Sequence, residues 1–161
     1  GEKMERRDKD NYYLDIAQTV SERSTCLRRK YGAIIVSNDE IVSTGYNGAP
    51  RGRANCVDLN YCTRNALNIP SGERYELCRS VHAEANAIIS ARRSEMFGAS
   101  LYLVGKDAVD NTYIKDASSC SMCKRLIINA GISRVVIRST HDEYVSINVR
   151  DWVYNDDTLV D

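Results

Sequence analysis

The 161-residue sequence has no long apolar run, only two prolines and few aromatic rings other than tyrosine. Its apolar runs fall far short of the roughly 20 residues that cross a bilayer, and no secretory signal opens the chain. The 22 basic residues balance 22 acidic ones, which argues against a broadly basic, nucleic-acid-binding face. One Phe and one Trp also argue against a base-stacking groove, although ten Tyr leave that alternative open. We therefore expect a cytoplasmic protein that binds neither membrane nor nucleic acid.

Length and apolar content indicate one domain with a proper core. The chain is as long as a single domain of ordinary size, and 43% of its residues are apolar. We treat residues 1–161 as this domain and expect residues 1–9 to be disordered or foreign to the natural chain.

Hydrophobic periodicity predicts alternating helices and strands. Helices are expected at 10–23, 81–93 and 120–130, and strands within 31–39, 40–48, 99–106 and 133–139. The first two strands form a hairpin, residues 48–79 a long loop, and residues 107–118 a turn or β-arm. Because helices connect the central strands, we expect a three-layer α/β/α fold around a mixed sheet of four or five strands. Residues 141–161 have no clear pattern.

Six cysteines in a chain without an export signal are notable. Disulfides are rare in reducing compartments, where spaced thiols more often bind metal or carry out redox chemistry. The cysteines therefore call for a metal-binding explanation first.

Two short motifs open two of the predicted helices. His82 and Glu84 begin the segment 81–93, while Cys120 and Cys123 begin 120–130. Alone, the first motif suits a core histidine and a dipole-complementing glutamate, and a C-x-x-C suits a redox site. Together, one imidazole and two thiolates make a three-ligand zinc site with a fourth position open for water. Because residues i and i+2 do not share a helix face, Glu84 is left as a general acid and base rather than a ligand.

An H-x-E followed by a C-x-x-C is typical of zinc-dependent nucleobase deaminases. Over most of its length the sequence resembles the deoxycytidylate (dCMP) deaminase family. Four stretches carry this resemblance: STCLRRKYGAIIV, STGYNGAPRG, GERYELCRSVHAEANAI and CSMCKRLIINAGI. The family has proline before its first cysteine, where this chain has Ser119. The family fold also adds a helix and a fifth strand after 133–139, and the short remaining tail suggests that this strand is short or absent.

The resemblance implies hydrolytic deamination of dCMP to dUMP and ammonia, which supplies dUMP for thymidylate synthesis. It implies that Zn²⁺ activates the water and that Glu84 protonates N3 and then the leaving ammonia. By the same resemblance, Asn47 hydrogen-bonds the deoxyribose. The backbone carbonyl of Ala83 and the chain near Ser119 face the amino group of the base.

A nucleotide substrate also requires basic side chains for its 5′-phosphate. The candidates lie before the first strand and after the GYNG loop: Arg28, Arg29, Lys30, Arg51 and Arg53. We favour Arg28, while many of these side chains are expected to be solvated surface charges. Tyr144 is either a residue that closes over the substrate or a packing residue.

Regulation and assembly are implied by the resemblance alone. Family members are often hexamers that dCTP with Mg²⁺ activates and dTTP inhibits. Arg93 matches a family position tied to this regulation, and Gly48 and Arg51 are further candidates. A plainer alternative makes Arg93 a cation that complements the C-terminal end of its helix.

The four remaining cysteines lie in or beside the long loop: Cys26, Cys56, Cys62 and Cys78. Four thiols suit a closed, structural zinc site, and some family members hold a second zinc at positions matching Cys26 and Cys56. The alternative is four separate thiols, since free cysteine is common in protein cores.

Three other functions remain open. The first is deamination of a modified dCMP or of another cytosine nucleotide such as dCTP. The second is a non-catalytic zinc protein that binds nucleotide. The third, a DNA- or RNA-editing module, would require the basic aromatic groove that the composition disfavours.

Overall fold

The computed structural model describes residues 6–70, 74, 77–114, 117 and 119–155. A five-stranded sheet forms the middle layer, in the order β2-β1-β3-β4-β5. Its strands are β1 Arg29–Ser37, β2 Glu40–Tyr46, β3 Ser100–Asp107, β4 Arg134–Arg138 and β5 Tyr144–Asn148. β3 and β4 are parallel, and the other neighbouring strands are antiparallel. The predicted mixed sheet is thus confirmed, with five strands.

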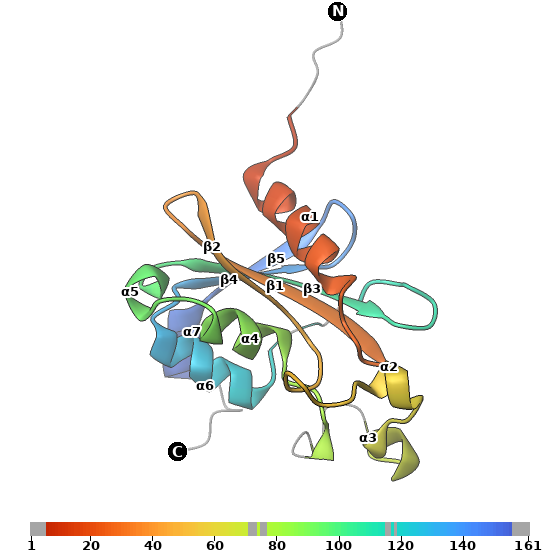
Figure 1. Cartoon of the computed structure of the whole chain (residues 1–161). Helices are drawn as coiled ribbons and strands as arrows, with labels where there is room; N and C mark the ends of the chain where they lie inside the picture. The colour runs from red at the N-terminus through yellow and green to blue at the C-terminus, as the bar shows by residue number, and fades with distance from the viewer. Residues whose placement is uncertain (1–5, 71–73, 75–76, 115–116, 118, 156–161) are drawn as a thin grey trace, which may run out of the picture.

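Helices cover both faces of this sheet (Figure 1). They are α1 Lys9–Ser21, α2 Cys56–Leu59, α3 Thr63–Ala66, α4 Ala83–Ile89, α5 Arg93–Met96, α6 Ser121–Ala130 and α7 Val149–Asn155. α1 lies on one face, while α4, α6 and α7 lie on the other. Each face has its own apolar core, so the predicted three-layer α/β/α architecture is confirmed.

Alternation along the strands divides their side chains between the two cores. Ile34 and Val104 pack with α1, whereas Ala33 and Leu103 belong to the core under α4 and α6. Gly45 lets α4 approach closely, since a Cβ there would lie 2.4 Å from the Ala83 carbonyl oxygen. The small side chains of α4 and this glycine together fix the position of the helix that carries the H-x-E motif.

The predicted helix 81–93 is shorter than expected. α4 ends at Ile89, Ser90 is its C-cap, and Arg92 is already extended at φ −82° and ψ 138°. Serine competes with helix backbone through its own hydroxyl and so favours a helix end. Arg93 therefore begins the separate helix α5 rather than ending α4.

Both ends of the chain differ from expectation in detail. Residues 1–5 lie outside the described residues, but Asp8 caps α1 and Arg7 is bonded to Asp15 and Asp142. At the other end, the fifth strand is present and runs antiparallel to β4. The helix α7 follows this strand, with Trp152 buried.

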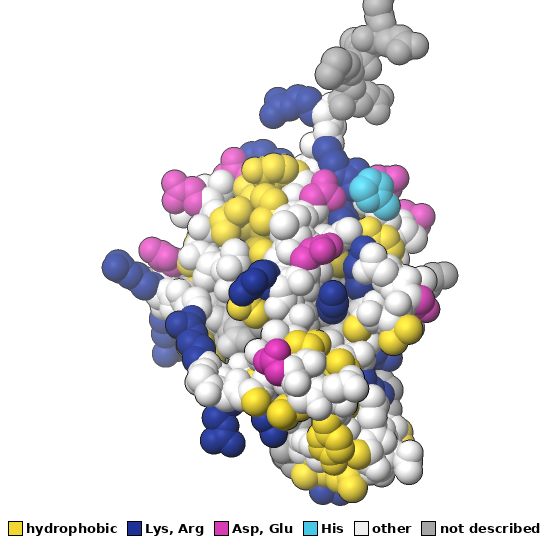
Figure 2. Space-filling view, turned by 45° about the vertical axis from the view of Figure 1, so that its right-hand side comes forward, with side chains coloured by type: hydrophobic (Ala, Val, Ile, Leu, Met, Phe, Trp, Pro, Cys, Tyr) yellow, Lys and Arg dark blue, Asp and Glu magenta, His cyan; other side chains and the backbone are white. Residues whose placement is uncertain are grey.

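The two predicted loops have structure of their own. The segment 48–79 contains α2 and α3, with residues 71–73 and 75–76 outside the described part. The segment 107–118 folds back so that Tyr113 bridges Lys106, as expected for a β-arm, although residues 115, 116 and 118 are not described. None of the helices in the described chain is both long and apolar enough to cross a bilayer. On the face in Figure 2, acidic and basic side chains are interspersed.

Candidate metal centre

Three side chains meet where α4 and α6 begin. His82 is the N-cap of α4, Cys120 is the N-cap of α6, and Cys123 lies in the first turn of α6. Both helices cover the same face and lead into the parallel strands β3 and β4. Helices that run antiparallel to parallel strands begin at one edge of the sheet. The topology therefore brings motifs almost forty residues apart to one point.

The geometry of these side chains fits zinc. The Nδ1 atom of His82 lies 3.5 Å from the sulfur of Cys120 and 3.4 Å from that of Cys123. All three ligand atoms lie within 4.8 Å of one another. In a tetrahedral site with Zn–N of about 2.0–2.1 Å and Zn–S of about 2.3 Å, nitrogen and sulfur would be about 3.6 Å apart. The donor atoms are thus already at coordination spacing.

The two thiols differ in acidity. The hydrogen bond from Cys123 and the nearby His82 lower the pKa of Cys120 to about 4. The pKa of Cys123 is raised, because its thiol hydrogen-bonds the Cys120 sulfur and is buried beside Glu84. The hydrogen bond to Cys120 also raises the pKa of His82, against the effect of burial. At least one thiolate, the form that binds zinc, is therefore available near neutral pH.

Glu84 lies beside this triad without belonging to it. Its side chain is 5% exposed, and no carboxylate joins the ligand cluster in the described chain. Burial raises the pKa of Glu84, while its own backbone N–H, His82 and Ser119 act in the opposite direction. A buried carboxyl with a raised pKa is suited to moving protons.

The GYNG loop is fixed to its surroundings by backbone hydrogen bonds. Gly48 and Val81 form a bridge, with Gly48 N–H to Val81 O at 3.2 Å and Val81 N–H to Gly48 O at 2.7 Å. The N–H of Thr25 donates to the carbonyl of Asn47. Three segments that are distant in sequence therefore lie side by side next to His82.

Two of the predicted substrate contacts are engaged within the protein. The Asn47 amide accepts from Tyr31 N–H at 2.8 Å and donates to the Arg29 carbonyl at 2.9 Å, so it holds the loop to β1. The Ala83 carbonyl oxygen lies close to Gly45 of β2. Asn47 thus holds the loop to β1 in the free protein, and substrate contacts of Asn47 and of the Ala83 carbonyl stay predictions.

Two other predicted contacts are better placed. Ser119 is 4% exposed and lies near enough to Glu84 to lower the pKa of the carboxyl. Arg28 is half-buried, and its Nη1 atom is buried without a hydrogen-bond partner in the described part of the chain. An arginine nitrogen in this state is available to an anion.

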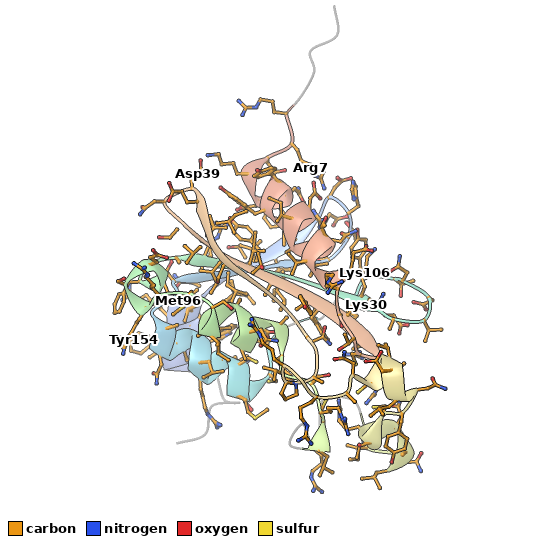
Figure 3. The ribbon with its side chains drawn as sticks, in the orientation of Figure 1. Arg7, Lys30, Asp39, Met96, Lys106 and Tyr154 are labelled. Carbon is orange, nitrogen blue, oxygen red and sulfur yellow. The ribbon has the colours of Figure 1, made fainter. Side chains whose placement is uncertain are left out.

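Several predicted residues lie elsewhere. Tyr144 packs with the core under α1 and its hydroxyl is 3.4 Å from Asp8, so it does not reach the metal centre. Lys30 pairs across strands with Lys106 near the C-terminal end of α1, which also puts it on the opposite face (Figure 3). Arg93 begins α5, after the C-terminal end of α4.

Arg51 and Arg53 are both exposed in the loop that follows Gly48. Both side chains are thus surface charges in the free protein, and a contact of either with a nucleotide stays a prediction.

The four other thiols share one neighbourhood. Burial raises the pKa of Cys56, and the charges of Cys26, Cys78 and Cys62 raise it further. Cys26 accepts a hydrogen bond from the backbone N–H of Arg28 at 3.4 Å. No three of these sulfurs, all of which are described, lie within 4.8 Å of one another.

One residue near the centre was not predicted. Arg64 in α3 is 7% exposed, donates to the Pro70 carbonyl, and lowers the pKa of His82 through its charge. No sequence pattern marks it, because its burial depends on how the segment 48–79 folds back.

Comparisons with known proteins agree with this geometry. Residues 7–139 match the family model for the cytidine and deoxycytidylate deaminase zinc-binding region. A deoxycytidylate deaminase of Mycobacterium phage D29 is 38% identical over 138 residues, which cover 83% of this chain and 96% of the phage protein. That of Schizosaccharomyces pombe is 31% identical over 133 residues, 83% of this chain and 38% of the yeast protein. The apo dCMP deaminase of cyanophage S-TIM5 superposes with a TM-score of 0.57 at 27% identity, over 83% of this chain and 85% of the phage chain.

Proposed function

The chain belongs to the cytidine and deoxycytidylate deaminase family, and from this premise we propose that it hydrolyses dCMP to dUMP and ammonia. The observation that carries the proposal is the convergence of His82, Cys120 and Cys123 at zinc-binding distances with Glu84 buried beside them. The similarity to the deoxycytidylate deaminase of phage D29, which this chain matches over nearly its full length, supports the choice of substrate.

The three ligands would hold Zn²⁺ with one position left for water, and the ion would supply a nucleophile by lowering the pKa of that water. Glu84 accepts the proton of the water as oxygen adds to C4 of cytosine. It passes this proton to N3, takes the remaining proton from the new C4 hydroxyl and passes that one to the amino group, so that the C4–N bond breaks, the C4 carbonyl forms and ammonia leaves. Ser119, beside the carboxyl, is placed to hydrogen-bond at this end of the base.

Arg28 is the proposed anchor for the 5′-phosphate. Its buried, unpartnered Nη1 would gain a charge-assisted hydrogen bond on nucleotide binding. A substrate carrying a phosphate would therefore bind better than the corresponding nucleoside.

Ammonia release tests the proposed function. We expect turnover of dCMP, at least tenfold lower kcat/KM for deoxycytidine, and none for single-stranded DNA, all measured on the zinc-loaded protein. Preference for deoxycytidine would contradict the nucleotide assignment. A lack of activity on all cytosine substrates would favour a non-catalytic zinc protein, and faster release from dCTP or a modified dCMP would change the substrate.

We also propose a structural zinc held by Cys26, Cys56, Cys62 and Cys78. The mutual effect of these thiols on the pKa of Cys56, and the backbone N–H bonded to Cys26, support a shared thiolate site that an ion would draw together. Metal analysis is expected to find two zinc ions per chain, and one after replacement of all four cysteines by serine. One zinc in the unaltered protein would contradict this second site.

Hexamer formation, a cytoplasmic location, activation by dCTP with Mg²⁺ and inhibition by dTTP stay predictions from the family resemblance. Arg93, Gly48 and Arg51 stay candidates for that regulation. Titration of the dCMP reaction with each nucleotide would test it directly.

A further inference from the structure

Buried polar atoms without partners gather near the metal centre. Five side-chain nitrogen or oxygen atoms in the described chain are buried without a partner at full hydrogen-bond geometry: Thr25 Oγ1, Arg28 Nη1, Ser80 Oγ, Ser119 Oγ, which lies beside the Glu84 carboxyl, and Arg138 Nε. The last lies under α1 on the other face of the sheet. The first four belong to the segments around the GYNG loop and the two zinc motifs. Because buried polar groups nearly always find a partner, such a cluster indicates where a ligand completes the hydrogen bonding.

Ser80 has a defined place relative to the zinc ligand. Val81 is bridged to Gly48, and His82 is extended at φ −68° and ψ 152°. Along extended backbone, side chains alternate, so Ser80 and His82 point to the same side of the bridge. Their Cα atoms are about 7 Å apart at the usual rise of an extended chain. Ser80 therefore lies two residues before the ligand His82 and next to Val81, which is bridged to the GYNG loop.

The Ser80 side chain can turn toward a ligand. The residue is half-buried as a whole, although its oxygen is covered. A serine hydroxyl moves between staggered positions by rotation about a single bond, and no hydrogen bond in the described chain holds this one in place. A change of rotamer at Ser80 would therefore break no hydrogen bond of the described chain.

We propose that Ser80 positions the substrate by hydrogen-bonding the sugar of the nucleotide. This inference rests on the proposed function, which sets C4 of the base at the metal. The sugar is attached across the ring from C4, so it extends from the ion toward Ser80 and the GYNG loop. Ser119 beside Glu84 then serves the base, Ser80 the sugar and Arg28 the phosphate, and Ser80 Oγ and Arg28 Nη1 each gain a partner that they lack in the free protein.

Binding of the product dUMP to the zinc-loaded protein, measured by calorimetry, tests this role together with the melting temperature. Ser80→Ala is expected to weaken dUMP binding about tenfold, since one neutral hydrogen bond is lost. It should leave the melting temperature unchanged, because the hydroxyl has no partner in the free protein.

Ser43→Ala is the matched control. The Ser43 hydroxyl is also buried, but it donates to the carbonyl of Ala87 in α4 at 2.7 Å. Its removal should lower the melting temperature by about 2–4 °C and leave dUMP affinity within twofold. The two substitutions are thus expected to have opposite effects: Ser80→Ala weakens dUMP binding alone, and Ser43→Ala lowers the melting temperature alone.

Ser80→Ala protein that binds dUMP like the unaltered protein would overturn the inference, and so would a fall in its melting temperature equal to that of Ser43→Ala. If either of these results is found while the unaltered protein deaminates dCMP, the proposed function stands and only the role of Ser80 falls. If the unaltered protein neither binds dUMP nor releases ammonia from dCMP, both fall together.

Discussion

Replacement of Glu84 by glutamine is expected to lower kcat for dCMP by a factor of about 10²–10⁴ while zinc remains bound. The amide keeps the size and most of the packing of a side chain that is 5% exposed, but it cannot take up or release the proton. Because Glu84 lies outside the cluster formed by His82, Cys120 and Cys123, the metal content should not change.

The measurement is steady-state ammonia release alongside zinc analysis of the same samples. Glu95→Gln is the control, since Glu95 is exposed on α5 and should leave both quantities unchanged. Activity within tenfold of the unaltered protein would remove Glu84 from the proposed chemistry. Loss of zinc from Glu84→Gln protein would instead indicate that Glu84 is a metal ligand.

Replacement of Arg138 by alanine is expected to cost about 3–5 kcal/mol of unfolding free energy. The side chain is 1% exposed and lies between the sheet and α1. It donates to Gln18 Oε1 at 2.9 Å, to the Asn11 carbonyl at 3.2 Å and to Asp15 Oδ1 at 2.8 Å. Alanine removes these bonds, leaves the buried Asn11 oxygens without this donor and opens a cavity under the only helix on that face of the sheet in the described chain.

Urea unfolding checks this value. Arg134→Ala is the control, because Arg134 pairs with Asp10 of α1 at 35% exposure against 1% for Arg138, and ion pairs contribute less as they become more exposed, so its loss should be clearly smaller. Equal losses for the two variants would show that burial of Arg138 does not decide its contribution. The metal centre lies on the opposite face, so zinc binding by folded Arg138→Ala protein should be unaffected.

Local sequence patterns predicted the elements that carry the chemistry. The C-x-x-C helix begins with Cys120 as its N-cap and ends at Gly131, whose φ of +83° suits glycine. His82 lies immediately before the helix rather than inside it, as the i, i+2 spacing with Glu84 requires. These features depend on capping and on side-chain geometry within a few residues, which a sequence displays directly.

Long-range placement was harder to predict. The sequence left Tyr144 open between closing over the substrate and packing, and Lys30 was one of several phosphate candidates; strand alternation turns both toward the α1 face. Arg64 gave no signal, because its burial depends on how the segment 48–79 folds back. Asn47 belongs to the loop as predicted, but its amide is engaged by the backbone of β1. The role of each residue depends on the face of the sheet to which its side chain points and on the backbone groups that it contacts. Both are decided only when the strands and loops are assembled.

The metal centre itself is tested most directly by anomalous diffraction at the zinc edge from crystals of the protein. We predict one peak about 2.0–2.1 Å from Nδ1 of His82 and about 2.3 Å from the sulfurs of Cys120 and Cys123, with a fourth ligand that does not come from the protein. Absence of a peak among these three atoms, or an ion there enclosed by four protein ligands, would contradict the account.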